Sequence, residues 1–124
     1  MIFIGNAQAV NFNQAGDTPI PVSLPSGYFI TSVLIGNLSA AASGGVYSLF
    51  SGPGQTGTRF FGVGGSTLKG PGTVTQAMPY PVGGGTPVET GSTLYFNVGT
   101  ANGAPLTGDV WVFGELWPPV VIQD

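Results

Sequence analysis

The sequence contains no histidine and no cysteine. Histidine is the usual general base near neutral pH, and cysteine supplies the thiolate nucleophile. The two residues are also the commonest nitrogen and sulfur ligands of metal ions in proteins. Their absence removes most catalytic and metal-binding arrangements, so we expect a protein that is not an enzyme and that uses no cofactor.

Charged residues are scarce, at 6% of the chain, against roughly a quarter in average soluble proteins. The positive charges are only Arg59 and Lys69, so a nucleic acid or an anionic membrane surface finds no basic stripe. A surface with few charges is also poorly protected against association. We therefore expect protein partners, including other copies of the chain, and neither nucleic acid nor membrane.

Long apolar runs are missing too, since no stretch approaches the roughly 20 residues that span a bilayer. The first six residues, from Met1 to Asn6, lack the basic region of a signal peptide. What the chain has in abundance is glycine and proline, 22 and 11 residues, with β-branched and aromatic residues between them. This pattern predicts short strands joined by turns.

Alternation of apolar and polar residues predicts the individual strands, since no helical periodicity is present. The expected strands cover residues 28–37, 46–50, 58–63, 73–78, 93–98 and 108–116, with two shorter extended pieces at 9–12 and 20–24. The length of 124 residues suits one domain. We therefore predict an all-β protein, a single-domain β-sandwich over residues 1–124, arranged as a jelly roll of about eight antiparallel strands. Residues 1–18 are expected to form an N-terminal arm and residues 117–124 an extended C-terminal tail.

The faces of two of these strands follow from their alternation. In residues 28–37, one face is expected to carry Ile30, Ser32 and Leu34, and the other Phe29, Thr31, Val33 and Ile35. In residues 93–98, Leu94, Phe96 and Val98 are expected to point inward.

The strand at 108–116 is apolar on both faces. Val110, Val112 and Leu116 lie on one face, and Trp111, Phe113 and Trp117 lie on the other. A sheet with one wet face would show polar residues at alternate positions, so this strand is expected to have a partner on each side. We therefore predict that Trp111, Phe113 and Trp117 belong to an interface.

The tail adds three more residues to this predicted interface. Pro118 and Pro119 favour an extended polyproline conformation. Val120, Val121 and Ile122 follow directly, and three β-branched apolar side chains are costly to leave in water. We expect this tail to dock on a neighbouring chain.

Two motifs are candidates for chemistry. Residues 52–57, Gly-Pro-Gly-Gln-Thr-Gly, match the dinucleotide-binding fingerprint, but a strand is expected after them where the motif needs a helix. They are therefore interpreted as a turn. The second candidate, the carboxylate pair Asp109 and Glu115, lies six residues apart on one strand, about 20 Å, which is too far for a glycosidase pair.

Other arrangements of side chains depend on the fold. Glu89 with Asp109 is a second carboxylate pairing, and Asp17, Glu89 or Asp109 with backbone carbonyls are candidates for a calcium site, although no ligand-spaced loop is present. Aromatic residues also allow stacking on sugar rings. The candidates for such stacking are Tyr28, Tyr80, Tyr95, Trp111 and Trp117.

Residues 27–37 and 45–50, followed by residues 94–98 and 107–115, resemble the small structural proteins of tailed bacteriophages, in particular the jelly-roll capsid decoration, or cement, proteins. The resemblance implies a virion protein, made in the bacterial host cytoplasm, that stabilises the capsid from its surface. Its partners would be the major capsid protein and other copies of itself, in a dimer or trimer. It carries over no binding residues. The alternative is a tail-fibre or tail-tip module that recognises host glycan.

Overall fold

The structure is a computed structural model that describes residues 2–22, 24, 27–79 and 87–118. These residues form eight strands and one helical turn, α1 (Gly65–Leu68). The strands are β1 (Ile2–Asn11), β2 (Gly16–Pro21), β3 (Gly27–Gly36), β4 (Val46–Gly52), β5 (Thr56–Gly64), β6 (Thr75–Ala77), β7 (Thr93–Thr100) and β8 (Thr107–Trp117).

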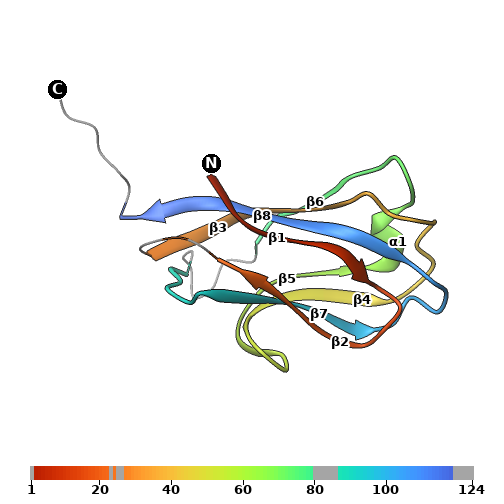
Figure 1. Cartoon of the computed structure of the whole chain (residues 1–124), viewed down its shortest axis with the longest axis horizontal. Helices are drawn as coiled ribbons and strands as arrows, with labels where there is room; N and C mark the ends of the chain where they lie inside the picture. The colour runs from red at the N-terminus through yellow and green to blue at the C-terminus, as the bar shows by residue number, and fades with distance from the viewer. Residues whose placement is uncertain (1, 23, 25–26, 80–86, 119–124) are drawn as a thin grey trace.

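The strands build two four-stranded sheets that face each other (Figure 1). The β8 sheet has the order β1-β8-β3-β6, and the β7 sheet has the order β2-β7-β4-β5. All neighbours are antiparallel. This is the strand order of a jelly roll, and the prediction of an all-β sandwich is confirmed.

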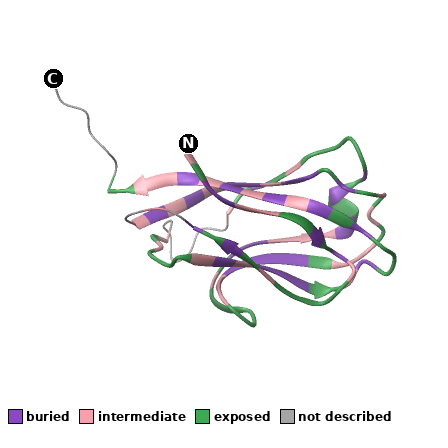
Figure 2. Cartoon of the chain, in the orientation of Figure 1, coloured by how far each residue is buried: buried purple, intermediate pink, exposed green. Residues whose placement is uncertain are grey.

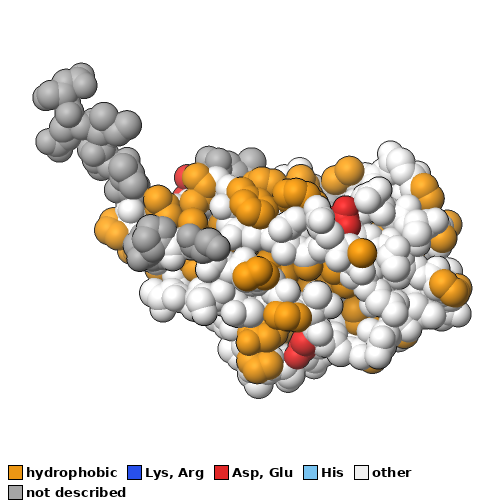
Figure 3. All heavy atoms as spheres, in the orientation of Figure 1, with side chains coloured by type: hydrophobic (Ala, Val, Ile, Leu, Met, Phe, Trp, Pro, Cys, Tyr) orange, Lys and Arg blue, Asp and Glu red, His pale blue; other side chains and the backbone are white. Residues whose placement is uncertain are grey.

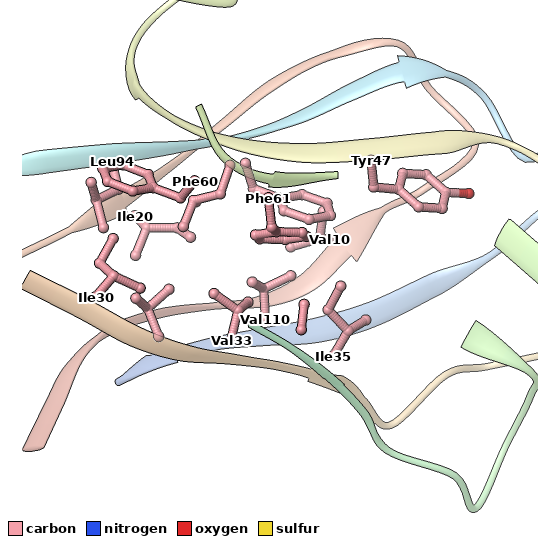
Figure 4. Close-up of a cluster of buried hydrophobic side chains, with 14 of the residues drawn as sticks. Val10, Ile20, Ile30, Val33, Ile35, Tyr47, Phe60, Phe61, Leu94 and Val110 are labelled. Carbon is pink, nitrogen blue, oxygen red and sulfur yellow. The ribbon is translucent and has the colours of Figure 1, made fainter. Parts of the chain in front are cut away.

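The core fills the space between the two sheets. Figure 4 shows Ile30, Val33 and Val110 of the β8 sheet pointing toward Ile20 and Leu94 of the β7 sheet. Buried and less buried residues alternate along β8 (Figure 2), as a strand with one face in the core requires. The inward positions expected on β7 are confirmed, and on β8 it is Val110 and Val112 that fill the core.

Three aromatic rings close one end of the core. The ring centroid of Phe12 lies 4.9 Å from that of Tyr47 and 5.3 Å from that of Phe96. All three side chains are fully buried. Phe12 follows β1 directly, so the first strand is anchored in the core at its end.

The faces predicted for β3 are wrong in part, because a β-bulge interrupts the alternation. Ile30 pairs with Gly114, but Ser32 pairs with the next residue, Phe113. The extra residue, Thr31, shifts every later side chain to the opposite face. Ile30 therefore points into the core together with Val33, whereas Leu34 lies on the outer face.

The N-terminal arm expected over residues 1–18 is also wrong. Residues 2–11 form β1, which pairs along β8, and residues 16–21 form β2, which pairs along β7. Pro19 and Pro21 lie in β2 at the edge of its sheet, where a missing donor is tolerated. The strand expected at 73–78 is shortened to β6.

Candidate functional site

The outer face of the β8 sheet collects aromatic residues from neighbouring strands. Trp111 and Phe113 lie on this side of β8. In the antiparallel register, Phe3 of β1 is opposite Phe113, and Leu34 of β3 is opposite Trp111. Directly opposed residues share a face, so these four side chains come together outside the core.

Ring contacts join these side chains into two groups. The ring centroid of Phe3 lies 5.6 Å from that of Trp111 and 6.1 Å from that of Phe113. Farther along β8, the centroids of Phe29 and Trp117 are 6.5 Å apart. These distances are typical of tilted and edge-on aromatic pairs.

We call this surface the apolar face. Its members are Phe3, Phe29, Leu34, Val74, Met78, Trp111, Phe113 and Trp117. Among the described residues, six large hydrophobic side chains are exposed, and only Val46 and Val88 of these lie elsewhere. Contiguous exposed apolar surface marks interaction sites, whereas scattered single residues do not. The apolar face is therefore the strongest candidate for a functional surface.

Figure 3 views the molecule from the side of β1 and β2 and shows hydrophobic side chains gathered along β1 and β8. Acidic side chains appear in this view, and no lysine or arginine does. A partner that depended on basic groups would find none on this side of the molecule.

A hollow of about 270 Å³ opens on the apolar face between β8, β3 and the chain that leads into β6. It is lined by Leu34, Gly36, Asn37, Val74, Asp109, Trp111 and Phe113. Most of its wall is apolar, and the two polar side chains stand at one end. The hollow is thus suited to small apolar groups.

Asp109, at the polar end of the hollow, is fully engaged within the protein. One carboxylate oxygen accepts a hydrogen bond from the Ala9 amide, and the other accepts one from Asn37 Nδ2, both at 3.0 Å. Ala9 and Asn37 both have φ of 53°, which is uncommon for residues other than glycine. Asp109 thus ties both neighbouring strands to β8, and its role is structural.

The carboxylates that are candidates for a pair or for a calcium site lie in different parts of the fold. Asp17 lies on β2 in the β7 sheet, whereas Asp109 lies on β8, and Glu89 exchanges backbone hydrogen bonds with Tyr28 of β3. Within the described ranges, no three acidic side chains come together as metal ligands. Burial raises the pKa of Glu89, partly offset by its hydrogen bond with Thr58. Burial and the nearby Glu89 charge raise the pKa of Tyr28 to about 12.

The turn between β4 and β5 lies within residues 52–57, as predicted. Gln55 and its neighbour Gly54 both have positive φ, and β5 follows directly, so no helix N-terminus is present for a phosphate. The aromatic residues considered for sugar stacking are also dispersed. Tyr28 is buried, Tyr95 lies on the β7 sheet, and Tyr80 is outside the described residues.

Of the predicted interface residues, Trp111, Phe113 and Trp117 lie together on the apolar face. Val120, Val121 and Ile122 lie outside the described residues. The sequence did not reveal that Phe3 and Leu34 join them. Phe3 was assigned to an arm, and Leu34 reaches this face only because of the bulge.

No known protein family, curated protein or solved structure matches the chain. In the part of the chain that the structure describes, no helix has the length and hydropathy to cross a membrane. What the apolar face binds is therefore inferred from its own chemistry.

Proposed function

We propose that this is a non-enzymatic structural protein that assembles through its apolar face. The resemblance to capsid decoration proteins supplies the setting. The protein would lie on a phage capsid and pack on the major capsid protein and on other copies of itself. The observation that carries the proposal is the exposed group of aromatic and aliphatic side chains on the outside of the β8 sheet.

Burial of this face supplies the driving force. Phe3 and Trp117 are each 48% exposed, which leaves about 100 Å² of each side chain in water. At about 25 cal/mol per Å², covering one of them contributes about 2.5 kcal/mol. Association itself costs roughly 4 to 15 kcal/mol, so several such side chains must be buried together, and the apolar face provides them.

The charge distribution supports attachment without ion pairs. The charged residues that β8 contributes to this face are the acidic Asp109 and Glu115, and Asp109 is held by internal hydrogen bonds. Attachment would depend on apolar burial and on hydrogen bonds from backbone and amide groups. Salt should therefore weaken it little.

Glycan recognition is the second candidate, because Trp111 and Trp117 expose part of their rings. A sugar site also needs converging polar groups with free hydrogen-bonding capacity. At the hollow, the polar side chains are Asn37 and Asp109, which bond to each other. This favours an apolar protein partner over a sugar.

Cosedimentation with capsids that lack the protein tests the proposal. We expect the protein to stay bound at about 1 M sodium chloride, where the Debye length falls to about 3 Å. Phe3→Asp should reduce the bound fraction at least about tenfold, because it places a charge in the apolar contact. Val46→Asp is the matched control, since Val46 is 45% exposed but lies on β4 of the other sheet.

Release of the wild-type protein at high salt would contradict the proposal, as would equal binding of the Phe3→Asp variant and wild type. Failure to bind capsids together with binding to a glycan array would replace it by the receptor-binding alternative.

A further inference from the structure

We infer that the hollow on the apolar face receives Val120, Val121 and Ile122 of a second copy of this chain. The inference rests on the proposed use of this face for assembly and names one of its occupants. Two observations support it. The described residues leave an apolar hollow open, and the apolar residues Val120, Val121 and Ile122 follow β8 after two prolines.

The hollow selects for small apolar groups. Leu34, Val74, Trp111 and Phe113 form its apolar walls, and Val74 is 66% exposed. Its volume of about 270 Å³ fits a few aliphatic side chains rather than a folded domain. An extended segment that inserts two or three short side chains suits such a site.

The sequence after β8 has the matching chemistry. Pro118 and Pro119 precede three consecutive β-branched residues. Proline-rich segments in the polyproline conformation dock into grooves lined by aromatic residues, because little conformational entropy is lost on binding. Trp111 and Phe113 provide aromatic walls of this kind.

The reach of the chain favours a segment from another copy. Trp111 lies six residues before Trp117 on β8, a distance of about 20 Å along the strand. Val120 is three residues beyond Trp117, and even a fully extended chain that doubled back would carry it only about 10 Å. Phe113, the wall nearest to Trp117, is four residues or about 13 Å away, beyond the reach of Val120. Ile122 would reach about 17 Å, past Phe113 but still short of Trp111, so the same chain cannot insert all three side chains into the hollow.

This contact uses only part of the apolar face. The hollow lies at the end of β8 that carries Asp109, whereas Phe29 and Trp117 lie at the other end. Phe3, on the β1 side, does not line the hollow. Neighbouring copies can thus be linked through the hollow while the Phe3 side of the face remains available to the shell.

The test compares self-association of the full chain with that of a variant that ends at Pro118. Sedimentation velocity over a range of concentrations should show an oligomer for the full chain. Truncation should weaken the association at least about tenfold, since the segment that fills the hollow is gone. Equal association of the two chains would overturn the inference and would indicate face-to-face packing instead.

A peptide with the sequence of residues 118–124 gives a direct readout. It should bind the truncated protein, and in a Trp117→Phe background the emission of Trp111 should shift to shorter wavelength as water leaves the hollow. A control peptide with serine in place of Val120, Val121 and Ile122 should not bind. Val74→Asp in the hollow should abolish peptide binding, and Val46→Asp should not.

Peptide binding that is absent, or that is equal in Val74→Asp and wild type, would overturn the inference. Its failure is distinguishable from that of the proposed function. If truncation leaves self-association unchanged while Phe3→Asp still releases the protein from capsids, only the inference fails. If the peptide binds as expected but the full chain never binds capsids, only the capsid role fails.

Discussion

The two outer faces of the sandwich differ in how their central residues are covered. On one face, hydrogen bonds within the chain satisfy the polar groups, and on the other, apolar side chains are exposed. On the β7 sheet, the buried Asn97 donates a hydrogen bond to Asp17 and accepts one from Gln55, both at 2.8 Å. The Gly54 amide, in the β4–β5 turn, donates to the other oxygen of Asp17 at 2.7 Å. The turn thus folds back over its own sheet and satisfies the polar groups there.

On the β8 sheet, the described residues provide no such cover. The corresponding central positions are Trp111 and Phe113, whose rings present mostly apolar area. The difference shows that a shared strand arrangement leaves the two surfaces free to differ. One is completed by contacts within the chain, and the other exposes apolar side chains among the described residues.

We expect the two faces to differ most in self-association when one negatively charged residue is placed on the central strand of each face. Trp111 on β8 and Tyr95 on β7 are both half-buried aromatic residues on outward positions. Trp111→Glu should weaken self-association at least about tenfold, because a charge would be desolvated in the contact. Tyr95→Glu should leave association unchanged, as measured by sedimentation velocity.

Thermal unfolding of both variants shows whether weaker association results from loss of the fold or from loss of the contact. If Trp111→Glu associates like the wild type and melts at the same temperature, the apolar face is merely exposed and takes no part in assembly.

Substitutions on the outer face of the β7 sheet should change the stability of the protein rather than its self-association. Asn97→Ala leaves Gln55 and one oxygen of Asp17 without their partner, and we expect it to lower the free energy of unfolding by about 1 to 3 kcal/mol. Urea denaturation measures this loss. Gln76→Ala is the counterpart on the β8 sheet, where an exposed Gln76 donates to Ser32 Oγ at 3.0 Å. Ser32 is buried, but removal of the exposed Gln76 side chain lets water reach its hydroxyl, so the loss should be smaller than that of Asn97→Ala. An equal loss would contradict the contrast between the two faces.

The smallest expected effect concerns Glu89, between the two sheets. Its raised pKa means that the folded state holds this proton more tightly than the unfolded state. The stability that it contributes is present below the ordinary pKa of 4.5 and is lost as pH rises through the higher pKa of the folded state. Glu89→Gln should remove this loss. The difference between the urea midpoints of variant and wild type should therefore grow in favour of the variant from pH 4 to pH 7.

A difference that stays constant with pH would show that Glu89 titrates alike in the folded and unfolded states. Other carboxylates change the stability of both proteins with pH, so the comparison between the two is the measured quantity.

The sequence predicted the β-sandwich and the two apolar faces of β8 correctly. Along β8, side chains alternate strictly between the core and the outer face. Val110 and Val112 fill the core, and Trp111 and Phe113 lie outside it, as expected. These positions are decided by the local period of two. The β8 members of the apolar face, Trp111, Phe113 and Trp117, were thus accessible from one strand alone.

The other members of the apolar face could not be predicted, because their positions depend on which strands pair and in which register. Phe3 joins the surface only through its register with Phe113, which is more than a hundred residues away along the chain. In β3, Val33, Leu34 and Ile35 are all apolar, so no polar position marks which side faces the core. The bulge at Thr31 decides it, and such an insertion has no distinct residue pattern here.

This ambiguity of β3 has a consequence for the order in which the chain folds. Its register is set by β8, and Thr31 Oγ1 contacts the Phe113 carbonyl 82 residues later. During synthesis, β3 therefore has no template until almost the whole described chain has left the ribosome. β4 and β5, joined by a tight turn, can pair early because little chain entropy is lost in closing their loop. The β7 sheet can thus begin to form first, and the β8 sheet, with its apolar outer face, is completed last.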